Sequence, residues 1–436
     1  MIQSIDLRGR RPTPSELRAL VHRAEVDVSA AIPVAADLIR DVRERGTTAL
    51  DEQADRFDGG RAAAIRVDPA SIAAAVTRLP QQIRAALDEV IDRERAASRA
   101  QVPAPAVTTV APGAQITQRW QPVDRVGLYI PGGKAVYPSS VVMNVVPAQV
   151  AGVGSIALAS PPQKDFEHGI HPLILGAAGV LGVDEVYAMG GAGAIGALAY
   201  GIPSLALDPV DVVAGPGNVY VAAAKRVVQG DVGIDAEAGP SEVLVIADAD
   251  ADPVVVAADL ISQAEHDESA AAVLVTDSAE LADAVRAELE RQVAQTAARE
   301  RVLVALAGPQ SAIVLVDDLD TAARVSDAYA PEHLEIQTAD PGAVLDRISH
   351  AGAIFLGTYS PVSLGDYLAG SNHILPTGGT ARFASGISAV TFLRPQQVVH
   401  YDTDALRTVA HHIRTMSDAE HLPAHGDAVD ARFRGD

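Results

Sequence analysis

The chain has 436 residues, 48% of them hydrophobic but only 4% aromatic, so it can bury more than one core and must build those cores from aliphatic side chains. Its 34 Lys and Arg against 56 Asp and Glu give a formal net charge of −22, which repels nucleic-acid phosphates and anionic lipid and excludes both as expected partners. Cysteine is absent, which excludes disulfides and thiolate metal sites.

Two long uncharged stretches, 135–163 and 186–207, are long enough to cross a bilayer. Both contain several Gly and Pro residues, and each is better interpreted as a buried helix and a buried strand of a parallel sheet. Residues 1–14 lack the apolar core of a signal peptide. We therefore expect a cytoplasmic protein with no membrane partner.

Helical patterns occupy residues 15–101. One helix begins at Ser15, and a second runs from Pro33 to Arg45 and is ended by Gly46. A third begins at the Asp68-Pro69 start signal and its pattern continues to Arg99. A polar, Pro-containing segment, 101–121, separates these helices from the next part of the chain.

A strand beginning at Arg125 runs into a turn that ends at Gly133, and regular alternation follows. The pattern predicts further strands at 155–159 and 185–189, and helices at 139–150, 171–181 and 192–200. Gly239-Pro240-Ser241 marks a boundary, after which the alternation repeats. We expect strands at 242–246, 272–276, 312–316 and 353–356, and helices at 252–266, 278–296 and 321–328. Such alternation predicts βαβ units and parallel sheets.

We therefore predict an α/β protein with two similar Rossmann-like domains, an N-terminal helical segment and a small C-terminal tail domain. The tail, with a helix near 404–416, is too small for a core of its own, so we expect it to pack on another domain or subunit. The expected boundaries are 1–22 for an arm packing with the tail, 23–124 with 239–385 for the first α/β domain, 125–238 for the second, and 386–436 for the tail.

The segment Ala330–Glu335 places a carboxylate beside an imidazole. Because Pro331 favours a first helical position, we interpret the segment as the first turn of a short helix. The positive end of the helix dipole would there favour the neutral ring of His333. Glu332 and His333 together then suit two proton transfers of one reaction. The alternative is an ordinary helix start with a surface His.

Two further segments contain candidate metal ligands. Gln263 and His266 are three residues apart at the end of a predicted helix and so share a face; alternatively His266 only complements the helix dipole. In the polar, Gly-rich segment 365–373, which we expect to be a loop, Asp366 could ligate a metal and His373 could hold a substrate. The alternative is a solvated turn.

Two glycine-rich segments suit a nucleotide. Gly191-Ala192-Gly193-Ala194-Ile195-Gly196 has the dinucleotide-binding spacing between a strand and a helix, but no acidic residue ends a strand about twenty residues later. The turn 215–220 could cradle phosphate with help from Asn218; the alternative is a tight turn in which Asn218 is only a helix cap. In the tail, His421 and His425 with nearby Glu420 would ordinarily be solvated side chains.

The combination and order of these segments resemble the histidinol dehydrogenase family over nearly the whole chain, to about residue 431. The resemblance is carried by VGLYIPGG, GPGNVYV, AGPSEVLVIAD, DLISQAEHD, APEHLEI, GDYLAGSNHILPT and the AHGDAV tail. It implies a four-electron oxidation of L-histidinol to L-histidine, with two NAD and one water, in a homodimer. One departure is visible, because Gly193 stands where the family usually has Gln in its GGAQA segment.

The resemblance also implies roles for individual residues. Glu332 and His333 match the catalytic pair, while Tyr129, Asn218 and the position of Gly193 match NAD contacts. A zinc ion is expected on Gln263, His266, Asp366 and, from the other subunit, His425. The implied substrate site contains these four ligands and the catalytic pair, together with Ser241, His373 and Glu420.

Three other functions remain possible from the sequence. Glu332 could activate water in a zinc hydrolase, which would leave the turn at 215–220 and Tyr129 without a role. A dehydrogenase of a related amino alcohol would use the same residues. A non-catalytic nucleotide-binding module is favoured only by the departure at Gly193.

Overall fold

The computed structural model describes residues 2–23, 28–132, 136–237 and 239–434. The chain forms two compact units, which are described separately. Unit 1 consists of residues 1–101 and 123–392, and unit 2 consists of residues 102–122 and 393–436. The Gly133 end of the predicted turn lies outside the described residues.

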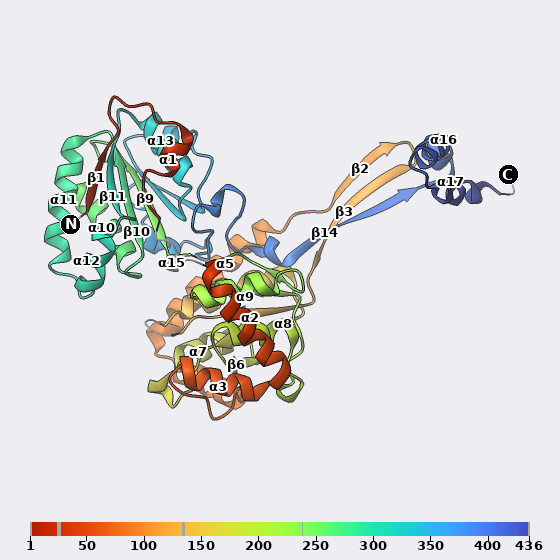
Figure 1. Ribbon diagram of the computed structural model, residues 1–436, viewed down its shortest axis with the longest axis horizontal. Helices are drawn as coiled ribbons and strands as arrows, with labels where there is room; N and C mark the ends of the chain where they lie inside the picture. Colours follow the sequence, from red (N-terminus) through yellow and green to blue (C-terminus); the bar gives the residue numbers. More distant parts are fainter. Residues whose placement is uncertain (1, 24–27, 133–135, 238, 435–436) are drawn as a thin grey trace. The chain divides into compact units, whose positions relative to one another are not determined.

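The first sheet of unit 1 has six parallel strands in the order β1-β11-β10-β9-β12-β13 (Figure 1). The strands are β1 Gln3–Asp6, β9 Glu242–Ala247, β10 Ala271–Thr276, β11 Ala312–Leu315, β12 His333–Gln337 and β13 Ala353–Leu356. One face is covered by α10 Pro253–Ala264, α11 Ala279–Val293 and α12 Arg299–Ala307. The other is covered by α1 Pro14–Arg18, α13 Leu319–Tyr329 and α14 Pro341–Leu345. The strand order changes direction between β9 and β12.

The apolar runs of the central strands follow from this double cover. The strands β9 (EVLVIA) and β10 (AAVLVT) are buried along their whole length, as expected for a parallel sheet with helices on both faces. The Asp252 side chain accepts a hydrogen bond from Val254 N at 2.8 Å and caps α10, and Pro253 occupies the first helical position. A short helix, α15 Val362–Tyr367, follows β13.

The second sheet of unit 1 has five parallel strands in the order β6-β5-β4-β7-β8. The strands are β4 Arg125–Tyr129, β5 Ser155–Ser160, β6 Val186–Ala188, β7 Val212–Ala214 and β8 Gly233–Ile234. Its helices are α6 Pro138–Ala151, α7 Pro172–Val180, α8 Gly191–Tyr200 and α9 Val219–Val228. The strand order here changes direction between β4 and β7, which is where open α/β sheets bind ligands at their carboxyl edge.

The N-terminal helices pack on the second sheet's helices rather than with the first sheet, which differs from the expected grouping of 23–124 with 239–385. They are α2 Val28–Arg45, α3 Thr47–Phe57, α4 Pro69–Arg78 and α5 Gln81–Gln101. Helix α2 packs on α8 and α9 (Figure 1), α4 packs on α7, and α5 packs on α6. The cause is their apolar faces, since Ala35 and Ile39 share a core with Ile195 and Leu198.

Several predicted bounds need correction. Residues 3–6 of the N-terminal arm form β1 and pair with β11 of the first sheet. Helix α2 begins before Pro33, and the pattern predicted to run from Asp68 to Arg99 is two helices separated at Pro80. The residue before this proline, Leu79, has an extended ψ of 128°, because a following proline disfavours the helical conformation. The other predicted strands and helices of the two alternating sections are confirmed within a few residues, apart from the segments at 330–335 and 365–373.

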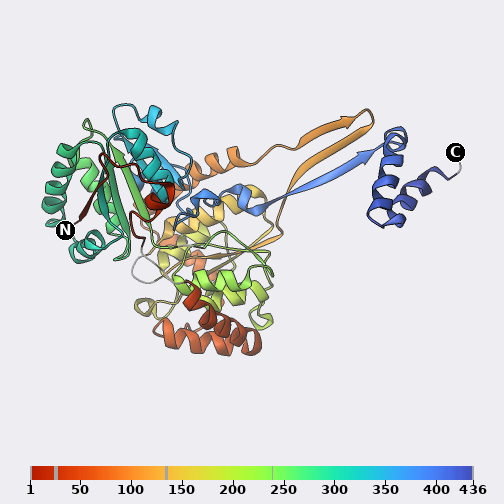
Figure 2. The ribbon, with the colours of Figure 1, turned by 45° about the horizontal axis from the view of Figure 1, so that its top comes forward.

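Unit 2 contains three antiparallel strands in the order β14-β3-β2 and two tail helices (Figure 2). They are β2 Ala106–Ala111, β3 Ala114–Pro122, β14 Leu393–Tyr401, α16 Thr403–Ala419 and α17 Pro423–Asp430. The polar segment 101–121 therefore contains two strands that its composition did not predict. The helix expected near 404–416 is confirmed by α16.

Among the described residues, no helix is long and apolar enough to cross a membrane. The two uncharged stretches instead contain α6 with β5 and β6 with α8, in agreement with the predicted buried helix and strand pairs.

A buried ion pair supports the turn after β7. Lys225 of α9 is 1% exposed, forms an ion pair with Asp235 and donates to Gly215 O at 2.9 Å. Asp235 also accepts from Gly215 N at 2.9 Å. Both partners are needed, because removing one would leave the other as an uncompensated buried charge.

We predict that Lys225→Met lowers the free energy of unfolding by about 3–5 kcal/mol, since Asp235 keeps its charge and loses its counter-ion. The measurement is urea unfolding followed by circular dichroism. The matched control is Arg226→Met on the same helix, whose half-exposed ion pair with Glu237 should contribute less than about 1 kcal/mol. Equal small losses in both variants would show that the buried pair does not support the fold.

Candidate active site at the amino edge of the first sheet

The segment that carries Glu332 and His333 leads into a strand. The prediction that it forms the first turn of a helix is therefore wrong. Helix α13 ends at Tyr329, and Ala330 adopts a left-handed conformation with φ 50° and ψ 68°. Pro331 therefore follows a helix end, a common position for proline. His333 is the first residue of β12, whose sequence HLEIQ alternates apolar and polar residues as a strand does.

The main chain of Glu242, at the start of β9, fixes both members of the pair. Its N–H donates to Glu332 Oε2 at 2.8 Å, and the Ser241 hydroxyl donates to the same oxygen at 2.6 Å. The Glu242 carbonyl oxygen lies 3.0 Å from His333 Nδ1. A carbonyl oxygen only accepts, so Nδ1 carries the proton and Nε2 presents its lone pair in the neutral ring.

Burial favours the uncharged form of both groups. It raises the pKa of Glu332 to about 8, against the opposing hydrogen bonds from Ser241 and Glu242. Burial lowers the pKa of His333, against the charge of nearby Asp366. His333 is therefore neutral at pH 7, while Glu332 can hold or release a proton.

His266 and Asp366 lie close together near this pair, and Gln263 precedes His266 by three residues. Gln263, near the end of α10, is 1% exposed, and neither its amide oxygen nor its amide nitrogen has a hydrogen-bond partner among the described residues. His266 Nε2 lies 3.8 Å from Asp366 Oδ2, and His266 Nδ1 lies 3.1 Å from Ser262 O. Asp366 belongs to α15, so the segment 365–373 begins in a helix rather than wholly in a loop.

These three side chains fit a metal that accepts nitrogen and oxygen ligands. The Ser262 carbonyl oxygen holds the proton on His266 Nδ1, which leaves Nε2 free for a metal. A buried amide without partners is costly, and a ligand to its oxygen would lower that cost. In the described parts of the chain, no three His, Cys, Asp or Glu side chains gather as a metal site.

His373 connects the site to the second sheet. Its Nδ1 lies 2.8 Å from Asp366 O, so Nε2 accepts a hydrogen bond from the Ser140 hydroxyl at 3.0 Å. Burial lowers the pKa of His373, which keeps the ring neutral. Ser140 belongs to the first turn of α6, which follows β4. The amino edge of the first sheet thus faces the carboxyl edge of the second at this hydrogen bond.

Tyr129 and Asn218 lie at that carboxyl edge. Tyr129 ends β4, and its buried hydroxyl accepts from Gly191 N at 3.2 Å. Gly215, after β7, has φ +117°, and a Cβ there would lie 2.0 Å from Tyr129 O, so only glycine allows this approach. The Asn218 oxygen caps α9 by accepting from Tyr220 N at 3.0 Å and Val221 N at 3.2 Å. The structure therefore shows Asn218 in the role of a helix cap, the alternative that the sequence left open.

Gly193 lies inside α8 and is buried. A Cβ at this position would lie 2.2 Å from Gln53 Oε1 of α3, and one at Gly196 would lie 3.2 Å from Ile39 of α2. Gly193 and Gly196, two of the three glycines of the dinucleotide-like spacing, therefore allow close packing between helices. This is the physical reason for the pattern in this chain.

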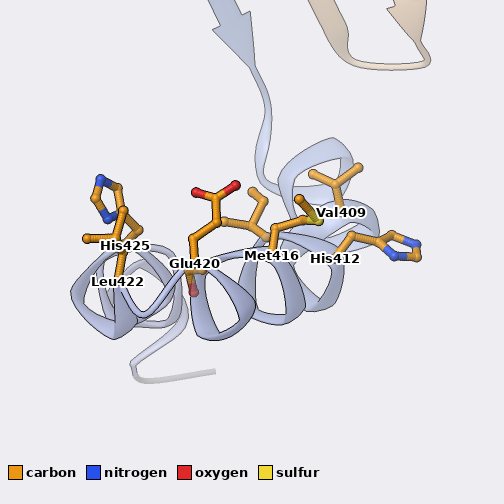
Figure 3. A pocket seen from close by; sticks show the side chains of 8 residues that line it. Val409, His412, Met416, Glu420, Leu422 and His425 are labelled. Carbon is orange, nitrogen blue, oxygen red and sulfur yellow. The ribbon is translucent and has the colours of Figure 1, made fainter.

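Glu420, His421 and His425 belong to unit 2. Glu420 follows α16, His421 has a positive φ of 57°, and His425 lies in α17. Glu420 and His425 line an apolar pocket with Val409, His412, Met416 and Leu422, and their side chains project to the same side of the tail (Figure 3).

Sequence reasoning missed Glu242 and Ser140. Glu242 stands directly before a run of five apolar residues, and a charged residue at the start of a fully buried strand was the available signal. Ser140 was recognised only as part of a helix start, and nothing in the sequence pairs it with His373.

The comparisons agree with one another. The histidinol dehydrogenase family model matches residues 21–433. The chain is 66% identical to a histidinol dehydrogenase of Leifsonia xyli subsp. xyli over 99% of each chain, and 58% identical to one of Streptomyces avermitilis over 99% of this chain and 98% of the relative. A solved histidinol dehydrogenase from Elizabethkingia anophelis is 33% identical, with a TM-score of 0.92, over 99% of this chain and 98% of that one.

The fold extends to a more distant group. An acetylating aldehyde dehydrogenase from Geobacillus thermoglucosidasius superposes with a TM-score of 0.50 at 14% identity, over 89% of this chain and 94% of that one. At this identity the likeness concerns the fold alone.

We predict that Glu332→Gln removes a pH-dependent loss of stability. Because the pKa of Glu332 is raised, the native state binds its proton between about pH 4.5 and 8 whereas the unfolded state does not, and stability falls as pH rises through this window. Relative to wild type, the variant should gain on the order of 3 kcal/mol between pH 5 and 8.

The measurement is the free energy of urea unfolding of chelator-treated protein at several pH values. The control is Glu290→Gln, an exposed position on α11, which should follow the wild-type curve. If the Glu332→Gln and wild-type curves run parallel, Glu332 titrates in the folded protein as it does in the unfolded chain.

Proposed function

Because the chain belongs to the histidinol dehydrogenase family, we propose that it oxidises L-histidinol to L-histidine, the last step of histidine biosynthesis, with NAD and zinc. The observation that carries the proposal is the geometry of Glu332 and His333. Both are held by the main chain of Glu242. Asp366 completes the group, because its charge is near enough to affect the pKa of His333. The two parallel sheets correspond to the two similar Rossmann-like domains of the proposal, with the catalytic residues on the first.

The residues that would hold zinc are Gln263, His266 and Asp366, with His425 from the second subunit of a homodimer. The unpartnered buried amide of Gln263 supports this assignment. When bound, zinc would grip the imidazole and amine of the substrate and orient its alcohol, without redox chemistry of its own. Ser241, His373 and Glu420, the last from the second subunit, are proposed to contact the same substrate.

NAD would accept the hydrides, and its proposed place is the carboxyl edge of the second sheet. This edge contains Tyr129, Gly191, Gly215 and Asn218, and it includes the change of strand order between β4 and β7. Since Gly193 is buried under α3, we infer that it acts through the packing of α8 rather than by contact with NAD.

The two oxidations use the two bases in turn. His333 Nε2 takes the proton of the substrate alcohol as the first hydride leaves carbon, and the product is histidinaldehyde. In its ionised form, Glu332 then takes a proton from the water that attacks the aldehyde carbon, and the resulting hydrate loses the second hydride to give the carboxylate. One histidinol, two NAD+ and one water thus yield one histidine carboxylate, two NADH and three protons. The aldehyde stays bound between the two steps.

The remaining features of the proposal concern partners and location. A homodimer with a shared site supplies His425 and Glu420 from the second subunit. The net charge of −22 supports the expectation of no nucleic-acid and no membrane partner. A cytoplasmic location fits a biosynthetic enzyme. A hydrolase using Glu332 would leave Tyr129 and the Ser140–His373 connection without a role.

We predict two NADH per histidinol when purified protein is mixed with zinc, excess NAD and limiting L-histidinol, because the hydrate step follows in the same site. Absorbance of NADH at completion is the measurement, and a chelator should abolish it. One NADH per histidinol would mean that the aldehyde leaves before Glu332 acts. No NADH with zinc bound would favour a related amino alcohol as substrate.

We predict that His333→Asn lowers kcat by about 10²–10⁴-fold, because a positioned base is lost while the Glu242 carbonyl can still be reached by an amide. Zinc content, measured by atomic absorption, should stay at the wild-type value. The control is exposed His22→Asn, which should turn over normally. Normal turnover of His333→Asn itself would remove His333 from the mechanism.

A further inference from the structure

Two buried acidic side chains lie directly behind the site. Asp259 belongs to α10 and Glu335 to β12, and both are almost fully buried. The Gln337 side-chain nitrogen donates to Asp259 Oδ2 and to Glu335 Oε2, each at 2.8 Å. One amide nitrogen therefore brings the two carboxyl groups together.

Glu335 reaches a third element with its other oxygen. The backbone N–H of Val362, the first residue of α15, donates to Glu335 Oε1 at 2.8 Å. The three residues Asp259, Gln337 and Glu335, here called the carboxyl bridge, thus join α10, β12 and α15 through hydrogen bonds.

Each joined element carries a site residue at a spacing that shares a face with the bridge. Gln263 follows Asp259 by four residues on α10, and Asp366 follows Val362 by four residues on α15. His333 precedes Glu335 by two residues on β12, so their side chains project from the same face of the sheet. The bridge therefore lies one helical turn, or one strand repeat, behind the converging site residues.

The bridge is an unusual choice for a core. Burial raises the pKa of Glu335 and that of Asp259, and the charge of Asp259 raises the pKa of Glu335 further. The partners named above are an amide and a backbone N–H, neither of which carries a charge. Well-packed apolar residues of similar volume often stabilise a fold as well as buried ionisable groups do. The directional hydrogen bonds between three elements are what apolar residues could not replace.

We propose that Asp259 and Glu335 are positioning residues that set the separation of Gln263 on α10, and of His266 just after it, from Asp366 on α15, and thereby the affinity of the site for zinc. This inference rests on the metal set of the proposed function. Outer hydrogen-bond partners of metal ligands typically contribute 10–100-fold in affinity, which gives the size of effect to expect here.

The experiment measures the zinc dissociation constant of the full-length protein by competition with a chromophoric chelator. The melting temperature of the metal-free protein is measured in parallel. Asp259→Ala and Glu335→Ala should each weaken zinc binding by roughly 10–100-fold. Asp259→Asn keeps the shape and can donate to Glu335, so it should bind zinc within about threefold of wild type.

Leu289→Ala is the matched control for lost stability. Leu289 is fully buried on α11 in the same core as α10, and makes no part of the bridge. The variant should melt at a lower temperature yet bind zinc as wild type does. A merely structural bridge would behave in the same way, with a lower melting temperature and unchanged zinc affinity in Asp259→Ala and Glu335→Ala.

Wild-type-like zinc affinity in the two alanine variants would overturn the proposal. If Glu335→Ala does not fold, Asp259→Ala decides alone, because it leaves the Glu335–Val362 hydrogen bond in place. A failure of the wild-type protein to bind zinc would refute the metal set itself, and the bridge proposal with it. Zinc binding by the wild type with unchanged binding by the variants refutes only the bridge.

Discussion

The interaction on which the site depends is the double hydrogen bond of the Glu242 main chain. Its N–H holds the Glu332 carboxyl group and its carbonyl oxygen holds the His333 ring, so both candidate bases are set by the main chain of one residue at the start of β9. This is possible because β9 and β12 are neighbouring parallel strands, with His333 paired to Val243. Main-chain groups of a central strand move little, and two bases held in this way need no reorganisation between successive proton transfers.

The two sheets contribute opposite edges. In the first sheet the site residues cluster at the amino ends of β9 and β12, where α10 and α15 also end. In the second, Tyr129 and Gly215 lie at the carboxyl ends of β4 and β7. Open parallel sheets ordinarily use the carboxyl edge for ligands, and the second sheet fits that rule. The first sheet instead contributes its amino edge, which is rich in acidic side chains. The Ser140–His373 hydrogen bond joins these two edges.

Much of the fold was predictable from sequence because parallel strands buried on both faces are continuous apolar runs, as in β9 and β10. The strands of unit 2 were not, since β3 mixes polar and apolar residues on a partly exposed sheet. The pairing of Glu332 with His333 was predictable from adjacency, but not the strand, because Pro331 marks either a helix start or the residue after a helix end. The carboxyl bridge was not visible in the sequence. Asp259 lies 76 positions before Glu335, and Glu335 lies two positions before Gln337, so only the fold brings Asp259 to the other two. A charged residue by itself also gives no sign in the sequence that it is buried.

Three histidines of unit 1 have the same hydrogen-bond arrangement at Nδ1 and differ in the group that faces Nε2. His266, His333 and His373 each direct Nδ1 at a main-chain carbonyl oxygen, of Ser262, Glu242 and Asp366 respectively. The carbonyl fixes the tautomer, and every Nε2 therefore presents a lone pair. Opposite His266 is the Asp366 carboxylate, which favours a shared cation. Opposite His373 is a hydroxyl donor, which holds that ring as an acceptor. His333 is buried beside a carboxyl group with a raised pKa, so its lone pair is the one best suited to take a substrate proton.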